Sequence, residues 1–103
     1  MKIRTYEDEK FINLELSGDS DWSLFQMIAN ELFETFKIEW KLQLDGLDQR
    51  YWDFEYKEVT LTLHLEHYLG ISIYADKSKN NLEKARHVLN KISLHFTEWN
   101  PLV

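Results

Sequence analysis

Apolar and polar residues alternate with a period of two through much of the segment from residue 38 to residue 76, the pattern of strands with one buried face. The apolar sets predict a four-stranded antiparallel meander over 38–45, 52–56, 59–65 and 69–75. The parity reverses at Lys57-Glu58, as a two-residue hairpin loop requires if both strands keep their apolar side chains on one face. This loop places Tyr56 opposite Val59 and, further along, Trp52 opposite Leu63.

The register of the first strand of this meander is predicted from charge. Placing Leu44 opposite Trp52 sets Lys41 against Glu55, an attractive pair, whereas a shift by two residues sets like charges against each other. In this register the strand directs inward its apolar residues, namely Ile38, Trp40, Leu42 and Leu44.

The last two strands of the meander are joined by a loop over residues 66–68. If Leu65 lies opposite Leu69, Thr62 neighbours Ser72 and Thr60 neighbours Tyr74 on the polar side. Both strands then contribute a polar face to the same side of the sheet.

Three further elements flank the meander. Residues 1–16 alternate around a polar turn and predict a hairpin, whose place in the sheet the sequence leaves open. Asp21 precedes an apolar stripe at helical spacing that runs from Trp22 to Phe36, and a second helix is expected from Asn80 or Asn81 to a stop at Pro101. The predicted fold class is α+β, a single domain over residues 1–103 built as a two-layer sandwich with both helices on one face of an antiparallel-rich sheet.

Charge is unevenly distributed along the 103 residues, whose net charge is −6. Residues 1–76 contain 16 acidic and 7 basic side chains, whereas residues 77–103 contain 2 acidic and 5 basic ones. Nucleic-acid binding depends on clustered Lys and Arg, so no nucleic-acid partner is expected, and a basic protein partner fits the acidic body better. No run is apolar and long enough for a membrane span or a secretory signal, which leads us to expect a soluble, cytoplasmic protein without a membrane partner.

The polar face of the meander supplies the candidate binding residues. They combine carboxylates, hydroxyls and one imidazole: Asp53, Glu55, Thr62, His64, Ser72 and Tyr74. Such groups are also the ingredients of acid, base and nucleophilic catalysis. A flat, open face offers no walled site, however, so we expect a non-enzymatic role and no catalytic residue.

The sequence His64-Leu-Glu66-His67 suggests an alternative site at the end of this sheet, for a metal or a small ligand. In a strand the side chains of His64 and His67 point to opposite faces, which disfavours joint coordination. No fourth ligand is evident and the chain has no cysteine, so we expect no metal and no cofactor. Phosphate-loop, dinucleotide, nucleophile-elbow and EF-hand motifs are also absent from the sequence.

The run YWDFEYKEVTLTLHLEHYLGISIY with its flanking helices resembles small uncharacterised bacterial proteins grouped as domains of unknown function. In size and acidity the chain is also similar to immunity proteins of bacterial toxin systems. The second resemblance implies a protein-binding module that uses its acidic sheet face. A structural homodimer, formed through a sheet edge or through a helix flank near Leu24, Met27 and Leu94, is a further hypothesis.

Overall fold

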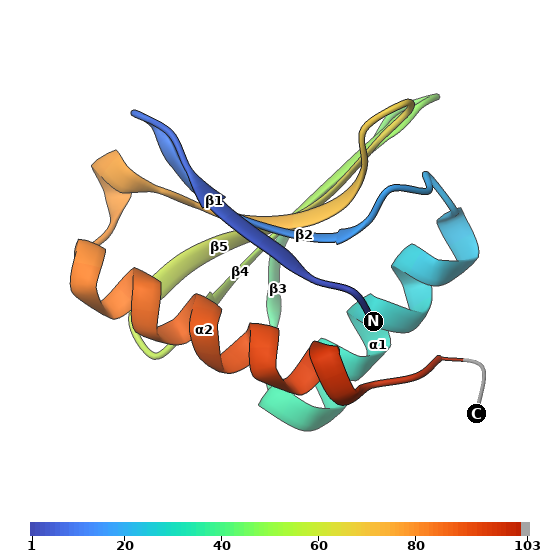
Figure 1. Ribbon diagram of the computed structural model, residues 1–103. Coiled ribbons are helices and arrows are strands. Elements are labelled where there is room, and N and C mark those ends of the chain that lie inside the picture. The colour runs from blue at the N-terminus through green and yellow to red at the C-terminus, as the bar shows by residue number, and fades with distance from the viewer. Residues whose placement is uncertain (102–103) are drawn as a thin grey trace.

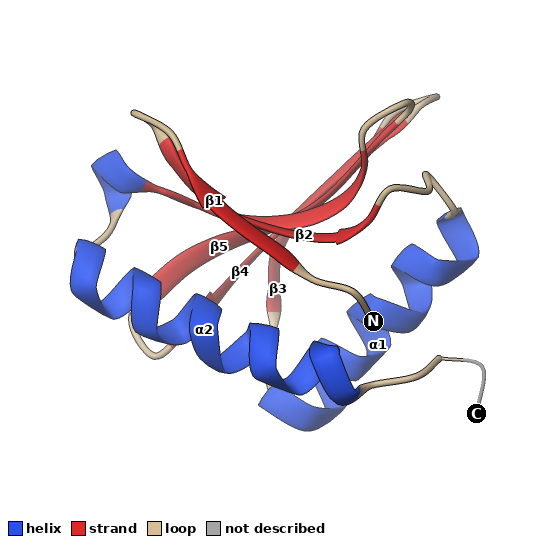
Figure 2. Cartoon of the chain, in the orientation of Figure 1, coloured by secondary structure: helices blue, strands red, loops and turns tan. Residues whose placement is uncertain are grey.

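A twisted antiparallel sheet lies over a layer of two helices in the computed structural model, which describes residues 1–101 (Figure 1, Figure 2). The elements follow the order β1 (Arg4–Glu7), β2 (Phe11–Ser17), α1 (Trp22–Phe36), β3 (Trp40–Asp45), β4 (Gln49–Tyr56), β5 (Val59–Glu66), β6 (Gly70–Asp76), the short 3-10 helix η1 (Lys77–Lys79) and α2 (Leu82–Glu98). This architecture confirms the predicted α+β sandwich with both helices on one face of the sheet.

The sheet has six strands in the order β1-β2-β6-β5-β4-β3. Strands β3 to β6 form the predicted meander, and every pairing in the sheet is antiparallel. The N-terminal hairpin, which the sequence could not place, joins the meander through β2 and β6, with Leu14 opposite Ile73. The last strand of the meander is therefore central, and the sheet ends at β1 and β3.

The core lies between the sheet and the helices. Each helix begins at a polar cap: the Asp21 side chain accepts hydrogen bonds from the backbone of Ser23 and Leu24, and the Asn81 side chain accepts one from Lys84. The predicted apolar stripe of α1 is buried at Phe25, Ile28, Ala29, Leu32 and Phe36, and α2 buries Ala85, Val88, Leu89, Ile92 and Phe96. The strands contribute alternate residues to the same core, so that each strand between the sheet edges has one buried and one uncovered side.

The predicted β4–β5 hairpin is confirmed, from Tyr56 opposite Val59 to Trp52 opposite Leu63. Its two loop residues, Lys57 and Glu58, adopt φ values of 48° and 67°. Positive φ at both positions matches the twist of the flanking strands, although neither residue is the Asn or Gly that favours this turn. Eight paired positions on β4 and β5 thus fix the register despite an unfavourable turn sequence.

The predicted register of β3 is wrong. Leu44 lies opposite Tyr51 instead of Trp52, and the pairing shifts between Trp40 and Leu42, so that Lys41 occupies a β-bulge instead of facing Glu55. The bulge keeps Trp40 against the core but turns Leu42 and Leu44 to the side away from the helices. Their exposed fractions are 47% and 53%, so these two leucines are not core residues as predicted.

A buried arginine explains this reversal. Arg50 is only 8% exposed and faces the helices, where its guanidinium lies 4.4 Å from the ring centre of Trp52 and 4.5 Å from that of Phe25. Asp45 lies directly opposite Arg50, and its Oδ1 accepts hydrogen bonds from Arg50 Nε at 2.9 Å and from Trp52 Nε1 at 2.8 Å. Because a buried guanidinium requires a partner, Asp45 must face the helices, and the alternate residue Leu44 must face away.

The β5–β6 register also differs from the prediction by two residues. Leu65 pairs with Ile71 instead of Leu69, which lies in the loop and is 66% exposed. Gly70 begins β6 at φ 89°, and a Cβ atom there would lie 2.1 Å from the backbone oxygen of Ser17. Only glycine fits this close approach, so the loop extends to Leu69. As a result Thr62 neighbours Tyr74, and Ser72 neighbours His64.

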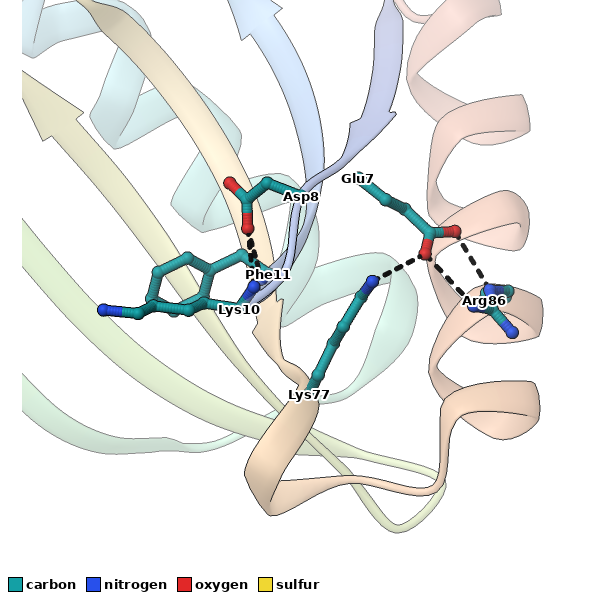
Figure 3. Close-up of polar contacts among 6 residues, drawn as sticks. All are labelled: Glu7, Asp8, Lys10, Phe11, Lys77 and Arg86. Carbon is teal, nitrogen blue, oxygen red and sulfur yellow. Dashed lines mark hydrogen bonds and ion pairs between the residues drawn. The ribbon is translucent and has the colours of Figure 1, made fainter.

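An ion-pair cluster fastens the N-terminal hairpin to the helical layer (Figure 3). The Glu7 carboxylate, at the end of β1, accepts from Arg86 Nε at 2.9 Å on α2 and lies 3.1 Å from Lys77 Nζ on η1. Hydrogen bonds from Arg86 and then Lys77 lower the pKa of Glu7 from 4.5 to about 2. In the adjoining turn, the Asp8 side chain accepts from the backbone of Lys10 and Phe11, which fixes the direction of the hairpin.

The Glu7 cluster predicts a specific pH dependence of stability. Because the folded-state pKa lies below the unfolded one, the stabilisation is complete above pH 4.5 and is lost as the pH falls towards 2. In thermal unfolding from pH 7 to pH 2, Glu7→Gln should melt below the wild type at neutral pH, and the gap should close at the acidic end. Glu9→Gln, which removes the same charge from the adjoining turn, is the control; a gap for Glu7→Gln that persists at pH 2 would contradict the assignment.

Removal of the arginine's partner should destabilise the fold. Asp45→Ala leaves the Arg50 guanidinium buried without its carboxylate, and we expect a loss of roughly 1 to 3 kcal/mol in the free energy of unfolding. Denaturant titration measures this loss, with Asp48→Ala as a control in the same turn. Equal stability of the two variants would show that Asp45 does not hold Arg50.

Candidate functional site

The side of the sheet away from the helices, called here the open face, is uncovered among residues 1–101. Figure 1 shows both ends of the sheet rising away from the helices, at the β1–β2 turn on one side and at the β3–β4 and β5–β6 turns on the other. The open face is therefore concave, and the prediction of a flat face is wrong. Its side chains, taken strand by strand, are Arg4 and Tyr6; Phe11, Asn13 and Glu15; Ser72, Tyr74 and Asp76; Thr60, Thr62, His64 and Glu66; Gln49, Tyr51, Asp53 and Glu55; and Leu42 and Leu44.

His64 lies at the centre of an aromatic group on this face. Its imidazole stacks on Tyr51, with ring centres 4.4 Å apart, and meets Tyr74 edge-on at 5.8 Å. Tyr74 in turn packs edge-on against Phe11 at 5.0 Å. Together these rings form a continuous band across β4, β5, β6 and β2. A band of packed rings is a rigid surface that a partner can contact with little loss of side-chain entropy.

Burial sets the ionisation of this band. It lowers the pKa of His64, and the nearby Glu66 carboxylate only partly opposes the effect. Burial likewise raises the pKa of Tyr74, with a hydrogen bond to Thr62 opposing it, and raises that of Tyr51. At neutral pH the centre of the open face therefore presents uncharged imidazole and phenol groups.

Two further predicted residues form a hydrogen bond beside this band. Thr62 Oγ1 donates to Asp53 Oδ1 at 2.6 Å, and the two residues pair across β4 and β5 as predicted. Glu55 lies at the exposed end of β4, opposite Thr60. All six predicted binding residues thus share the open face, although Thr62 is beside Tyr74 instead of Ser72.

A trough of about 430 Å³ is hollowed into the open face. It is lined by Arg4, Tyr6, Phe11, Asn13, Glu15, His64, Tyr68, Leu69, Gly70, Ser72 and Tyr74. His64, Ser72 and Tyr74 were predicted; the rest of the lining was missed because it comes from the hairpin, whose position the sequence left open, and from the β5–β6 loop. The only signal in the sequence was the presence of aromatic residues, Tyr6 and Phe11, on the polar side of the alternating hairpin. This signal becomes informative once β2 is known to pair with β6.

A larger hollow of about 610 Å³ lies between the β4–β5 turn and α2. Its rim includes the ion pair between Lys84 and Glu58, both exposed at the surface. Long charged side chains of this kind move freely and define no fixed shape. The trough, whose walls are paired strands and packed rings, is the better candidate site.

Carboxylates dominate the charge of the open face. It presents Glu15, Asp53, Glu55, Glu66 and Asp76 against the single guanidinium of Arg4. Arg4 itself shows how the face receives a cation: its Nη2 lies 2.6 Å from Glu15 Oε2, and its guanidinium lies 5.1 Å from the ring centre of Tyr6.

The end of the sheet at His64 and His67 does not form a metal centre in the described residues. His64 Nε2 lies 3.5 Å from Glu66 Oε2 and has no hydrogen-bond partner, while His67 packs against Tyr68 in the exposed loop. Within residues 1–101 no group of three His, Asp or Glu side chains could hold a metal ion. The contacts of His64 are thus predominantly aromatic.

The fold and the open face define a small α+β domain in which two helices cover one side of a sheet and the other side is an acidic face with an aromatic-lined trough. The chain belongs to the family described as "Protein of unknown function (DUF3630)", whose model matches residues 1–93. The match spans all six strands and most of α2. No curated protein and no solved structure matches the chain. Neither helix in the described residues has the length and apolar character needed to cross a bilayer.

The partly buried imidazole of His64 predicts a second pH effect, which arises from desolvation of the ring and not from an ion pair as at Glu7. Because the folded-state pKa of His64 is lowered below 6.5, the unfolded state takes up the proton first, and stability falls as the pH drops below about 6.5. His64→Phe, which keeps the stacking on Tyr51, should remove this part of the acid destabilisation. Chemical denaturation of both proteins between pH 8 and pH 5 measures it. If the stability difference between them does not change with pH, His64 is not held neutral by the fold.

Proposed function

We propose that this chain is a non-enzymatic protein-binding module whose open face binds a basic partner. The observation that carries the proposal is the open face itself, an uncovered sheet surface on which a trough of about 430 Å³ lined by aromatic rings lies beside an excess of carboxylates. Tyr is enriched at protein interfaces because one ring supplies a large contact area and a hydrogen-bonding hydroxyl. The lowered pKa of His64 and the raised pKa of Tyr74 keep both rings uncharged at neutral pH, so they would meet a partner as neutral contact groups.

The chemistry of the face favours arginine and lysine side chains in the partner. A guanidinium or ammonium group gains from aromatic rings and carboxylates together, as the Arg4, Tyr6 and Glu15 contacts illustrate within the chain. The surrounding acidic charge would also accelerate the encounter with a cationic protein. An immunity protein that covers the basic surface of a toxin is the form of this function that the size and acidity of the chain favour.

Charge reversal on the open face tests this function. Glu55→Lys with Glu66→Lys should abolish or strongly reduce recovery of a basic partner from the native host, because two attractive charges become repulsive. The matched control is Asp19→Lys with Glu34→Lys, which makes the same change in net charge at exposed positions before and within α1. Partners are identified by mass spectrometry, and their affinity for each variant is measured at low and high salt.

A substitution in the trough separates specific binding from general electrostatics. Tyr6 is 44% exposed, so Tyr6→Ala should leave the fold intact while lowering the affinity for the same partner by at least about fivefold. Equal recovery by the wild type and the charge-reversed variant, or capture of acidic partners only, would contradict a basic partner on this face.

A further inference from the structure

The β3 edge presents an unusual combination of apolar side chains and free backbone. β3 is the last strand of the sheet, so one of its edges has no neighbouring strand within residues 1–101. Leu42 and Leu44, on the open face of this strand, are about half exposed. An edge strand that carries exposed leucines invites pairing with another strand, because its backbone donors and acceptors and its apolar surface are satisfied together.

The opposite edge of the sheet differs in kind. β1 has only four residues, and charged contacts occupy both of its sides: Arg4 pairs with Glu15 on the open face, and Glu7 pairs with Lys77 and Arg86 towards the helices. Short, charged edge strands resist pairing. β3 also carries a bulge and a lysine, which protect an edge, but both lie near its first residue, so the stretch from Leu42 to Asp45 is the part of the sheet edges better suited to an additional strand.

We propose that a second copy of this chain pairs with β3, antiparallel and edge to edge about a twofold axis at Gln43. In such an antiparallel pair, directly opposed residues lie on the same face of the sheet. Gln43 lies on the other face from Leu42 and Leu44, so it cannot oppose either leucine of the second copy. The axis must therefore pass beside a residue that opposes its own copy. Three such centres lie in the middle of β3, namely Leu42, Gln43 and Leu44.

Apolar contact and the bulge select the middle centre. With the axis at Gln43, Leu42 opposes Leu44 of the second copy, twice over by symmetry, and the bulge residue Lys41 lies next to this pair at the end nearest to Asp45 of the second copy. With the axis at Leu42, Leu44 opposes Trp40, which the bulge places on the other face, and with the axis at Leu44, Leu42 opposes Gly46 and loses its apolar partner. The Gln43 register alone pairs both leucines.

The structure leaves room for this contact. The Asp45 side chain is 46% exposed, and its Oδ2 lies 3.4 Å from Arg50 Nη2, so this oxygen can accept a further bond from a lysine. Gln43 faces the helical side yet is exposed, so the helices do not cover β3 there. The resulting sheet would be continuous across two copies, with both open faces on the same side and both troughs away from the joint.

Single cysteines test the register, since the chain has no cysteine of its own. In Gln43→Cys the two sulfurs meet at the axis, where Cα atoms of opposed residues lie roughly 4.5 to 5.5 Å apart, within the range of a disulfide. The control is Leu47→Cys, at a position 96% exposed and beyond the end of β3. In this register the Cα atoms of the two copies of Asp45 would lie roughly 13 Å apart, too far for a disulfide. Leu47 lies two residues beyond Asp45, outside the paired strands. Mild oxidation should give covalent dimer for Gln43→Cys at least about tenfold faster than for Leu47→Cys; equal rates, or no dimer from Gln43→Cys, overturn the proposal.

Sedimentation equilibrium of the wild-type chain gives an independent measurement. We expect a monomer–dimer equilibrium whose dissociation constant rises on the order of tenfold in Lys41→Glu, which replaces the cation near Asp45 of the second copy by a second acidic group, twice over by symmetry. Lys2→Glu makes the same charge change at an exposed position near the other edge of the sheet and should leave the constant unchanged. A wild-type protein that stays monomeric at all concentrations, or equal constants for the two variants, overturns the proposal; neither result bears on binding of a basic partner by the open face.

Discussion

The buried Arg50 guanidinium and its contact with Asp45 determine which side of the sheet each residue of β3 faces. Arg50 lies among Trp22, Phe25 and Trp52, where a charge without a partner would be strongly unfavourable. Asp45 must therefore turn towards the helices, and the bulge at Lys41 absorbs the resulting change of parity. The two leucines on the open face, and the apolar edge that they create, follow from this single ion pair.

The concavity of the open face has a separate physical origin. Strand twist accumulates across the six strands, and both ends of the sheet rise away from the helices (Figure 1). The Glu7 cluster holds one rising end by tying β1 to α2, while Gly70 allows the β5–β6 loop to approach the β2 backbone at the other end. The trough thus lies between two fastened ends, which gives it a defined shape without a covering layer.

The sequence predicts this fold well wherever local pattern alone decides the structure. The β4–β5 hairpin, both helices and the shared face of the six predicted residues follow from periodicity and are all observed, although Trp22 at the start of the α1 stripe is 40% exposed. The β3 and β5–β6 registers do not follow from periodicity, because they depend on contacts between residues distant in the sequence. For β3 the contact is the pocket that Trp22 and Phe25 form around Arg50, and for β5–β6 it is the backbone of Ser17 against Gly70. Charge pairs worth a few tenths of a kcal/mol could not outweigh a buried guanidinium. The trough was only partly predictable for the same reason, since five of its eleven lining residues come from a hairpin that pairs with β6, about 60 residues further along the chain.

An uncovered sheet needs polar side chains for solvation, but it does not need aromatic ones. Thr60 and Asn13 satisfy that requirement, whereas Tyr6, Tyr51, Phe11 and Tyr74 add apolar area that residues 1–101 cover only in part. Cross-strand packing of these rings stabilises the sheet by only a modest amount per pair, and threonine or valine would serve nearly as well. Placing them beside five carboxylates is what a surface shaped for cationic side chains requires. We therefore propose contact with a partner, in addition to the stability of the sheet, as the reason for the composition of the open face.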